Sequence, residues 1–304
     1  MGSLTNHQNH QSITTNEEDQ VIVIMVPFPA QGHLNQLLQL SCLVSSHNIP
    51  VHYVGSAIHN CQAKTRANAL NPNDVAKIHF HDFPIPPFAS PPPNPKSSHK
   101  FPTQLQPAWN AAWTLQRPIA DYTLEMSARA KRVVVIHDPL MATVVQDVAS
   151  IPKCELYAFN CISAFSWASL GCEKMGKTFP LERELPPIIE CLSEDLAFYL
   201  EIQNAALVHR AGDLYNTCRF IEAPYLDILS EKEVVGLVVR EWTNDGVLVK
   251  ASTIEDVVKR LMASEEGNEI RRSAEELANR VRRATEEGGE SKVEFDSFLA
   301  HITR

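Results

Sequence analysis

The sequence predicts an α/β fold, with a doubly wound parallel sheet built from residues 20–231. Short runs of apolar, β-branched residues alternate with helical stretches, which is the pattern of repeated βαβ units joined by right-handed crossovers. Two of the runs, 21–26 (VIVIMV) and 132–138 (RVVVIHD), are apolar almost throughout. Such runs are typical of strands that helices cover on both faces.

The elements are expected in the following order. The first strand, 21–26, enters a proline-containing loop that ends at Gly32-His33, and a helical pattern opens at Leu34. Further strands are predicted at 50–54, 76–80, 132–138, 155–159 and 213–217. Helices are predicted at 34–45, 59–68, 103–130, 140–149, 163–170, around 192–209 and from 221. The sheet should hold about seven strands and end near Ser230.

Residues 82–102 contain eight prolines, a density that forbids a helix or a central strand and predicts an extended loop. The loop could be a PxxP-type partner ligand, but a surface excursion is the favoured interpretation. Residues 232–304 are richer in charge, and they offer only one short strand, 236–240, and three helices. These helices are expected at 253–263, about 270–284 and 293–302, which is too little for a second nucleotide-binding sheet.

The composition of the chain argues against several classes of partner and site. A net charge of −9 and a pI near 5.7 argue against nucleic acid as a partner, because phosphate binding requires a basic face. Seven scattered cysteines without CxxC spacing indicate neither a disulfide framework nor a zinc site. No stretch approaches the ~20 apolar residues of a membrane span. The polar residues 1–19 read as a disordered tail without a secretory signal, so a cytoplasmic protein is expected.

Several side chains are candidates for chemistry. His33 follows the first strand, at the sheet edge where open α/β folds bind ligands, so it could be a general base or an ordinary turn residue. Asp138 could be an N-cap. Trp109 and Trp113 could pack in the core or face a flat aromatic acceptor. His79 and His81 share one strand face, but ordinary strand-end histidines are favoured there, and no metal site is predicted.

Three segments carry a family resemblance: PFPAQGHLNQ at 27–36, VVVIHDPLMATVVQDVASIP at 133–152 and GDLYNTCRFIEAPYLDIL at 212–229. They resemble plant UDP-dependent glycosyltransferases, in the branch that includes the zeatin O-glucosyltransferases. The similarity runs through residues 17–231 and resumes near Gly236 with GLVVREW. The resemblance implies that 20–231 is the acceptor-binding Rossmann-like domain of a GT-B type enzyme.

It also implies inverting transfer of glucose from UDP-glucose, a co-substrate, to a hydroxyl of a small cytokinin-like molecule. No tightly bound cofactor is implied. His33 would be the catalytic base and Asp138 the carboxylate on its Nδ1. The acceptor-binding residues are predicted to be Gly32, Trp109, Trp113, Met141 and Phe159. In the resembled family the proline-rich loop borders the acceptor pocket.

The donor-binding signature of the resembled family is absent from the sequence. It begins with Trp-Ala-Pro-Gln, passes through His-Cys-Gly-Trp-Asn-Ser and closes with Asp-Gln after an acidic residue; the phrase does not occur here. An internal deletion joined near residues 231–235 is therefore expected, with 232–304 a remnant of the donor domain. The chain is expected to be inactive alone. The alternative is a non-catalytic acceptor-binding or interaction protein; the sequence sets no oligomeric state.

Overall fold

A computed structural model describes residues 20–67, 70–92, 94, 96, 103–174, 192–231 and 264–304. The predicted tail 1–19, the strand 236–240, the helix 253–263 and much of 93–102 lie outside the described residues. The chain divides into two compact units. The first consists of residues up to Pro93 with 104–159 and 198–213, and the second of 94–103, 160–197 and 214–304.

The six strands in the described residues form one sheet of order β3-β2-β1-β4-β5-β6. They are β1 (Val21–Val26), β2 (Val51–Ser56), β3 (His79–Phe83), β4 (Arg132–His137), β5 (Cys154–Asn160) and β6 (Gly212–Tyr215). The pairs β1/β2, β1/β4, β2/β3 and β4/β5 are parallel. The predicted doubly wound sheet is confirmed, with six strands in place of about seven.

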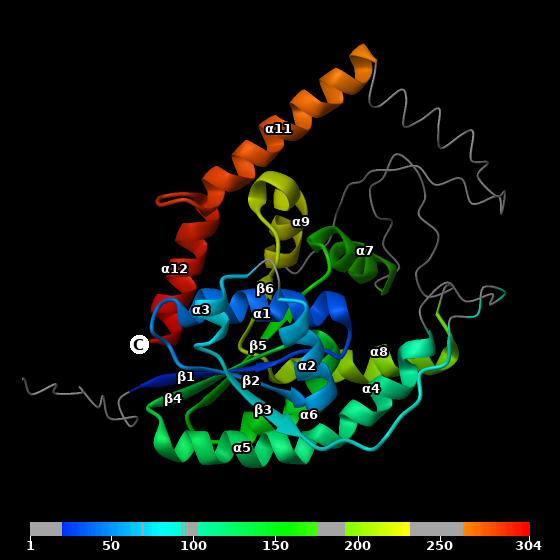
Figure 1. Cartoon of the computed structure of the whole chain (residues 1–304), viewed down its shortest axis with the longest axis vertical. Coiled ribbons are helices and arrows are strands. Elements are labelled where there is room, and N and C mark those ends of the chain that lie inside the picture. Colours follow the sequence, from blue (N-terminus) through cyan, green and yellow to red (C-terminus); the bar gives the residue numbers. More distant parts are fainter. Residues whose placement is uncertain are drawn as a thin grey trace, which may run out of the picture. The chain divides into compact units, whose positions relative to one another are not determined.

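Helices cover both faces of this sheet, which explains why its central strands are apolar throughout. Helices α1 (Gln31–Ser45) and α2 (Ala57–Thr65) lie over one face, and α5 (Gln116–Arg129) lies over the other (Figure 1). All six side chains of β1 are buried, as are those of β4 from Val133 to His137. A sheet buried on both faces in this way leaves only its strand ends open to ligands.

The long helix predicted over 103–130 is divided. The structure has the 3₁₀ turn η2 (Thr103–Leu105), α4 (Gln106–Ala112), the 3₁₀ turn η3 (Trp113–Leu115) and then α5. Pro118 accounts for the break: it has no N–H to donate to the preceding turn, and its ring would clash with the carbonyl four residues earlier. It is tolerated in the first turn of α5, where the N–H groups have no helical partner in any case.

Other boundaries differ by a few residues. The strand predicted at 76–80 lies at 79–83, because 72–75 form the short helix α3 (Pro72–Val75) that Asn71 caps through the Asn73 N–H. The helix predicted at 140–149 is a chain of short turns: η4 (Pro139–Met141), α6 (Ala142–Val145) and η5 (Gln146–Ser150). Residues 84–92, in the proline-rich segment, form neither helix nor strand, as predicted.

The second unit contains α7 (Ala164–Lys174) and α9 (Arg219–Glu231). The residues of helix α8 (Glu194–Ala206) belong to the second unit up to Ala197 and to the first unit from Phe198. The 3₁₀ turn η7 (Leu207–His209) follows this helix. Glu222 is buried, and its two carboxylate oxygens each accept one backbone N–H, at 3.0 Å, from Ala164 and Phe165 at the start of α7. A carboxylate on free N–H groups at a helix N-terminus is stabilising, so this contact joins α9 to α7.

The second unit also contains α11 (Glu265–Thr285) and α12 (Glu290–Ile302). The apolar stripe predicted on α11 is buried only at its carboxyl end: Ile270 and Leu277 are exposed, whereas Ala284 is buried. Glu294 of α12 pairs with Arg219 of α9 at 3.0 Å. Within the described part of the chain, no helix combines the length and apolar character needed to cross a membrane.

Candidate active site

The candidate site lies at the switch point of the sheet, between β1 and β4, where the order in which strands are added reverses. From β1 the chain proceeds to β2 on one side, whereas β4 pairs with β1 on the other. Open α/β sheets bind ligands at such a switch point, outside the carboxyl ends of the two strands. The strand ends are in register, with Val26 opposite His137, and the Asp138 N–H donates to the Val26 carbonyl at 3.0 Å. The residues that follow β1 and β4 are thereby brought together.

His33 is placed by the first turn of α1. The prediction that the helix opens at Leu34 was wrong by one turn: α1 begins at Gln31, after an extended Ala30 whose carbonyl accepts the N–H groups of His33 and Leu34 at 2.9 Å. The imidazole is therefore held by helical backbone. Gly32 is exposed, and a Cβ built there would have no neighbour within 4 Å, so the helix start borders open space.

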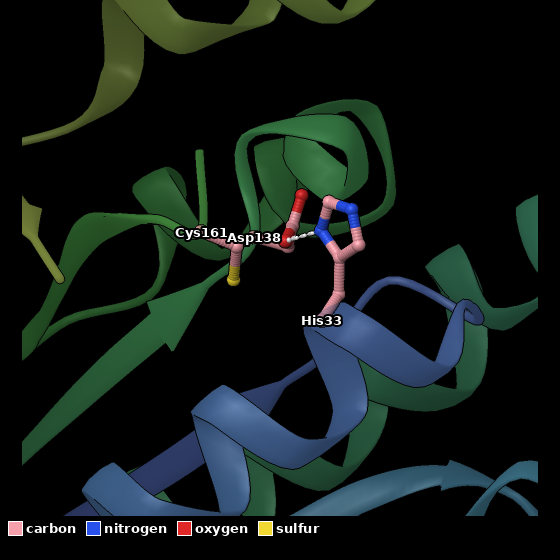
Figure 2. Close-up of side chains that lie close together, drawn as sticks. All are labelled: His33, Asp138 and Cys161. Atoms are coloured by element: carbon pink, nitrogen blue, oxygen red, sulfur yellow. Dashed lines mark hydrogen bonds and ion pairs between the residues drawn. The ribbon is translucent and has the colours of Figure 1, made fainter. Parts of the chain in front are cut away.

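His33 and Asp138 form a direct pair. Figure 2 shows the imidazole and the carboxylate turned toward each other, with Nδ1 of His33 2.6 Å from Oδ2 of Asp138. The Asp138 side chain is 2% exposed and that of His33 22%. The other carboxylate oxygen, Oδ1, accepts the Leu140 N–H at 2.9 Å at the start of η4. Asp138 is therefore both an N-cap and the partner of His33, one oxygen for each.

The charge and burial around His33 are compatible with a general base. Burial lowers the pKa of His33, but the charge of Asp138 and its hydrogen bond act in the opposite direction and prevail, so the pKa is raised. Because an ionised carboxylate can only accept, Nδ1 carries a proton and Nε2 of the neutral ring keeps its lone pair. This arrangement can take a proton from a hydroxyl at Nε2 and stabilise the resulting imidazolium.

Aromatic side chains adjoin His33. The Phe28 ring lies 5.1 Å from the imidazole and 5.0 Å from Trp109, measured between ring centroids. Tyr199, from α8, lies 6.3 Å from Phe28 and stacks on Trp113 at 5.5 Å with an interplanar angle of 5°. The sequence analysis named both tryptophans as core or acceptor-facing side chains, which stays a prediction, and it did not name Phe28 or Tyr199. Phe28 stands inside the quoted loop motif, whereas nothing in the sequence connects the distant Tyr199 to it.

Tyr199 ties this aromatic group to the segment that follows β4. Its hydroxyl donates to the Leu140 carbonyl at 2.6 Å, two residues after Asp138. Burial, followed by the charge of Asp138, raises the pKa of Tyr199, so the phenol stays protonated and can keep donating. The rings of Phe28, Trp109, Trp113 and Tyr199, named here the aromatic wall, are thus fixed relative to Asp138.

The remaining predicted acceptor residues lie deeper. Met141 is 1% and Phe159 5% exposed, so both are core side chains, and their role toward an acceptor stays a prediction. Trp109 is also buried, yet its indole N–H has no hydrogen-bond partner within the described residues. Buried donors are nearly always paired, so this indole N–H beside Phe28 is a donor that a bound molecule could satisfy.

Comparison with known proteins identifies the family. Residues 19–239 match the family described as glycosyltransferase, N-terminal domain. The chain belongs to this family. Its relatives in this glycosyltransferase family include the zeatin O-glucosyltransferase of Phaseolus lunatus, 44% identical over 218 residues, and the zeatin O-xylosyltransferase of Phaseolus vulgaris, 43% identical over 220. The resemblance to the zeatin branch is thereby confirmed.

The match covers part of each relative. In both Phaseolus proteins the alignment spans 70% of this chain and 46% of the relative, so the chain spans about half the length of the curated relatives it matches. Two solved structures align with TM-scores of 0.53: Glycyrrhiza uralensis UGT73P12, at 14% identity over 71% of this chain and 48% of that one, and LpCGTa in complex with UDP, at 15% over 81% and 64%. These support the fold of this glycosyltransferase domain.

Proposed function

We propose that this chain supplies the acceptor side and the general base of a UDP-glucose-dependent O-glucosyltransferase. The observation that carries the proposal is the 2.6 Å contact between His33 Nδ1 and Asp138 Oδ2 at the switch point of the sheet. The acceptor would be a small plant metabolite with a hydroxyl group, of the cytokinin type, and the reaction cytoplasmic.

In the proposed reaction, His33 removes the proton of the acceptor hydroxyl at Nε2. The acceptor oxygen attacks the anomeric carbon in line as the bond to UDP breaks, which inverts the configuration. The proton stays on the imidazole, whose positive charge Asp138 stabilises, while UDP leaves with the bonding electron pair.

The aromatic wall supports a flat acceptor. Planar rings such as a purine stack well on Trp and Tyr side chains, and the unpaired Trp109 N–H could bind an acceptor heteroatom. Relatives named for zeatin at 43–44% identity support this acceptor class. The names of these two relatives differ in the sugar, glucose or xylose, so the glucose assignment rests on the overall resemblance.

The residues that would bind the sugar donor are missing from this chain's sequence. The sequence lacks the donor-binding signature, and we propose that residues 232–304 are a remnant of the donor domain. Without groups that hold UDP-glucose the reacting carbon is not positioned, and positioning contributes roughly 7–11 kcal/mol to lowering the barrier. The 304 residues alone are therefore proposed to be inactive. The same absence favours a second candidate, a non-catalytic acceptor-binding protein.

The test is UDP release by the purified chain with UDP-glucose and trans-zeatin, compared with His33→Ala. His47→Ala is the matched control, because His47 is an exposed imidazole at the other end of α1. No release above the enzyme-free background is expected from the wild-type chain. Release above that background that requires His33 would support the base but contradict the inactivity of this chain, and release above it that His33→Ala leaves unchanged would overturn the role of His33.

A further inference from the structure

A second group of histidines lies in the first unit, away from the loops that follow β1 and β4. His52 comes from β2, His79 and His81 from β3, and Tyr122 from α5. The register of the parallel pair sets His52 opposite His79, so the three imidazoles emerge on one face of the sheet. That face is the one α5 covers, which brings Tyr122 to them (Figure 1).

Three polar atoms of this group converge. Nδ1 of His52 lies 3.0 Å from Nε2 of His81, and the Tyr122 hydroxyl oxygen lies 2.6 Å from both nitrogens. His79 does not join this triangle, but its ring stacks on that of His52 at 5.0 Å.

Hydrogen bonds alone satisfy such a triangle poorly. A ring nitrogen has one in-plane site, so it either donates or accepts, and the hydroxyl has a single proton. With neutral rings, one N–H must be shared between two acceptors, or two nitrogen lone pairs must face each other at 3.0 Å. Three atoms that can each serve as a metal ligand, lying within 3.0 Å of one another, could instead share a metal ion.

We propose that His52, His81 and Tyr122 bind a divalent transition-metal ion. Imidazole ligands suit Zn²⁺ and Cu²⁺. A tetrahedral ion with bonds of 2.0–2.1 Å needs ligand atoms about 3.3 Å apart. The two imidazole nitrogens must therefore separate by about 0.3 Å, and the Tyr122 oxygen must move about 0.7 Å further from each of them. A solvent molecule would complete the coordination.

The electrostatics favour neutral, ligand-competent rings. Burial, followed by the positive charge on His79 and His81 when protonated and by Arg129, lowers the pKa of His52 to about 4. Burial and His79 also lower the pKa of His81, against the opposing charges of Asp82 and Glu125. A proton therefore does not compete with a metal at neutral pH.

Tyr122 requires one further step. Burial raises its pKa, so without metal it is a phenol. On coordination the O–H bond breaks, the proton passes to solvent, and the oxygen pair binds the cation. The ion would link β2, β3 and α5, and it would stabilise the folded state because it binds that state and not the unfolded chain.

The sequence alone offered only the His79–His81 pair, for which ordinary strand histidines were favoured. The structure replaces that pair with a different set. His52 and Tyr122 are added by strand register and by helix packing, and neither is visible as ligand spacing in the sequence.

The experiment is titration of Zn²⁺ into the purified chain by calorimetry, with His52→Gln, His81→Gln and Tyr122→Phe variants. His47→Gln is the matched control, since it removes an exposed imidazole outside the triangle. One Zn²⁺ per chain is expected. Because even outer-shell partners change metal affinity 10–100-fold, loss of His81 should weaken binding at least about 100-fold, with His47→Gln unchanged.

Cu²⁺ provides a readout that separates this site from adventitious binding to other histidines. A phenolate bound to Cu²⁺ gives a visible charge-transfer band, which Tyr122→Phe should abolish while the folded far-UV circular dichroism is retained. Equal Zn²⁺ affinity in His81→Gln and His47→Gln would overturn the proposal. So would a Cu²⁺ spectrum unchanged by Tyr122→Phe.

Discussion

Replacing Asp138 by Asn separates the two roles of this side chain. The Asn oxygen can still accept the Leu140 N–H, as Oδ1 does now at 2.9 Å. The amide NH₂ then takes the place of Oδ2, 2.6 Å from Nδ1 of His33. Because NH₂ only donates, Nδ1 must accept and the His33 proton moves to Nε2. Asp138→Asn therefore yields the tautomer that cannot act as a base at Nε2.

The size of the effect follows from the change in hydrogen bond. A bond to a charged group contributes about 1.5–3 kcal/mol and a neutral one about 0.5–1.5, so Asp138→Asn should lower the free energy of unfolding by about 1 kcal/mol. The pH dependence has a definite sign. Since the folded-state pKa of His33 lies above 6.5, the extra stability is fully present below pH 6.5 and is lost as pH rises through the folded-state pKa.

Two assays check this. Urea unfolding at pH 5.5 and pH 9 should show a larger difference between wild type and Asp138→Asn at the lower pH, and ¹⁵N NMR of His33 should show the proton moving from Nδ1 to Nε2. Asp147→Asn, an exposed carboxylate, is the control and should change stability by less than about 0.5 kcal/mol. A difference that grows with pH, or a His33 tautomer that does not change, would refute the reasoning.

Three further predictions concern stability and are checked by urea unfolding. Tyr199→Phe should keep the ring stack but leave the partly buried Leu140 carbonyl without this partner, at a cost of about 1–3 kcal/mol. Glu222→Ala should cost a similar amount, about 1–3 kcal/mol, because two N–H groups of α7 lose their acceptor, and Glu222→Gln should lose less. Gly289→Ala should destabilise by about 1–3 kcal/mol, since its Cβ would lie 2.2 Å from a backbone oxygen of α11. A loss below 0.5 kcal/mol in any of them would contradict the corresponding contact.

The sequence predicted well the features that depend on a short stretch of chain, such as the positions of the central strands. The apolar runs at 21–26 and 132–138 identified the two central strands, whose carboxyl ends meet at one edge of a parallel sheet. The pairing of His33 with Asp138 came from the family resemblance, because the residues alone also allowed a turn histidine and an N-cap. The break before Pro118 was missed although proline chemistry explains it, because the apolar stripe around the tryptophans continues through it.

What the sequence did not predict depends on contacts between distant segments. Tyr199 reaches the aromatic wall from α8, and neither its spacing nor its neighbours in the chain indicate that position. His52 meets His81 only because β2 and β3 pair in one particular register. A shift of one residue would turn His52 to the other face, so such contacts are set by tertiary structure.

The most direct test of the central claim is calorimetric titration of trans-zeatin and, separately, UDP into the purified 304-residue chain. The account predicts one trans-zeatin site and no binding of UDP. Trp113→Ala should weaken trans-zeatin binding about tenfold, because stacking on an aromatic side chain contributes about 1–3 kcal/mol per base. Absence of trans-zeatin binding, or saturable binding of UDP, would contradict an acceptor-side glycosyltransferase domain without a donor site.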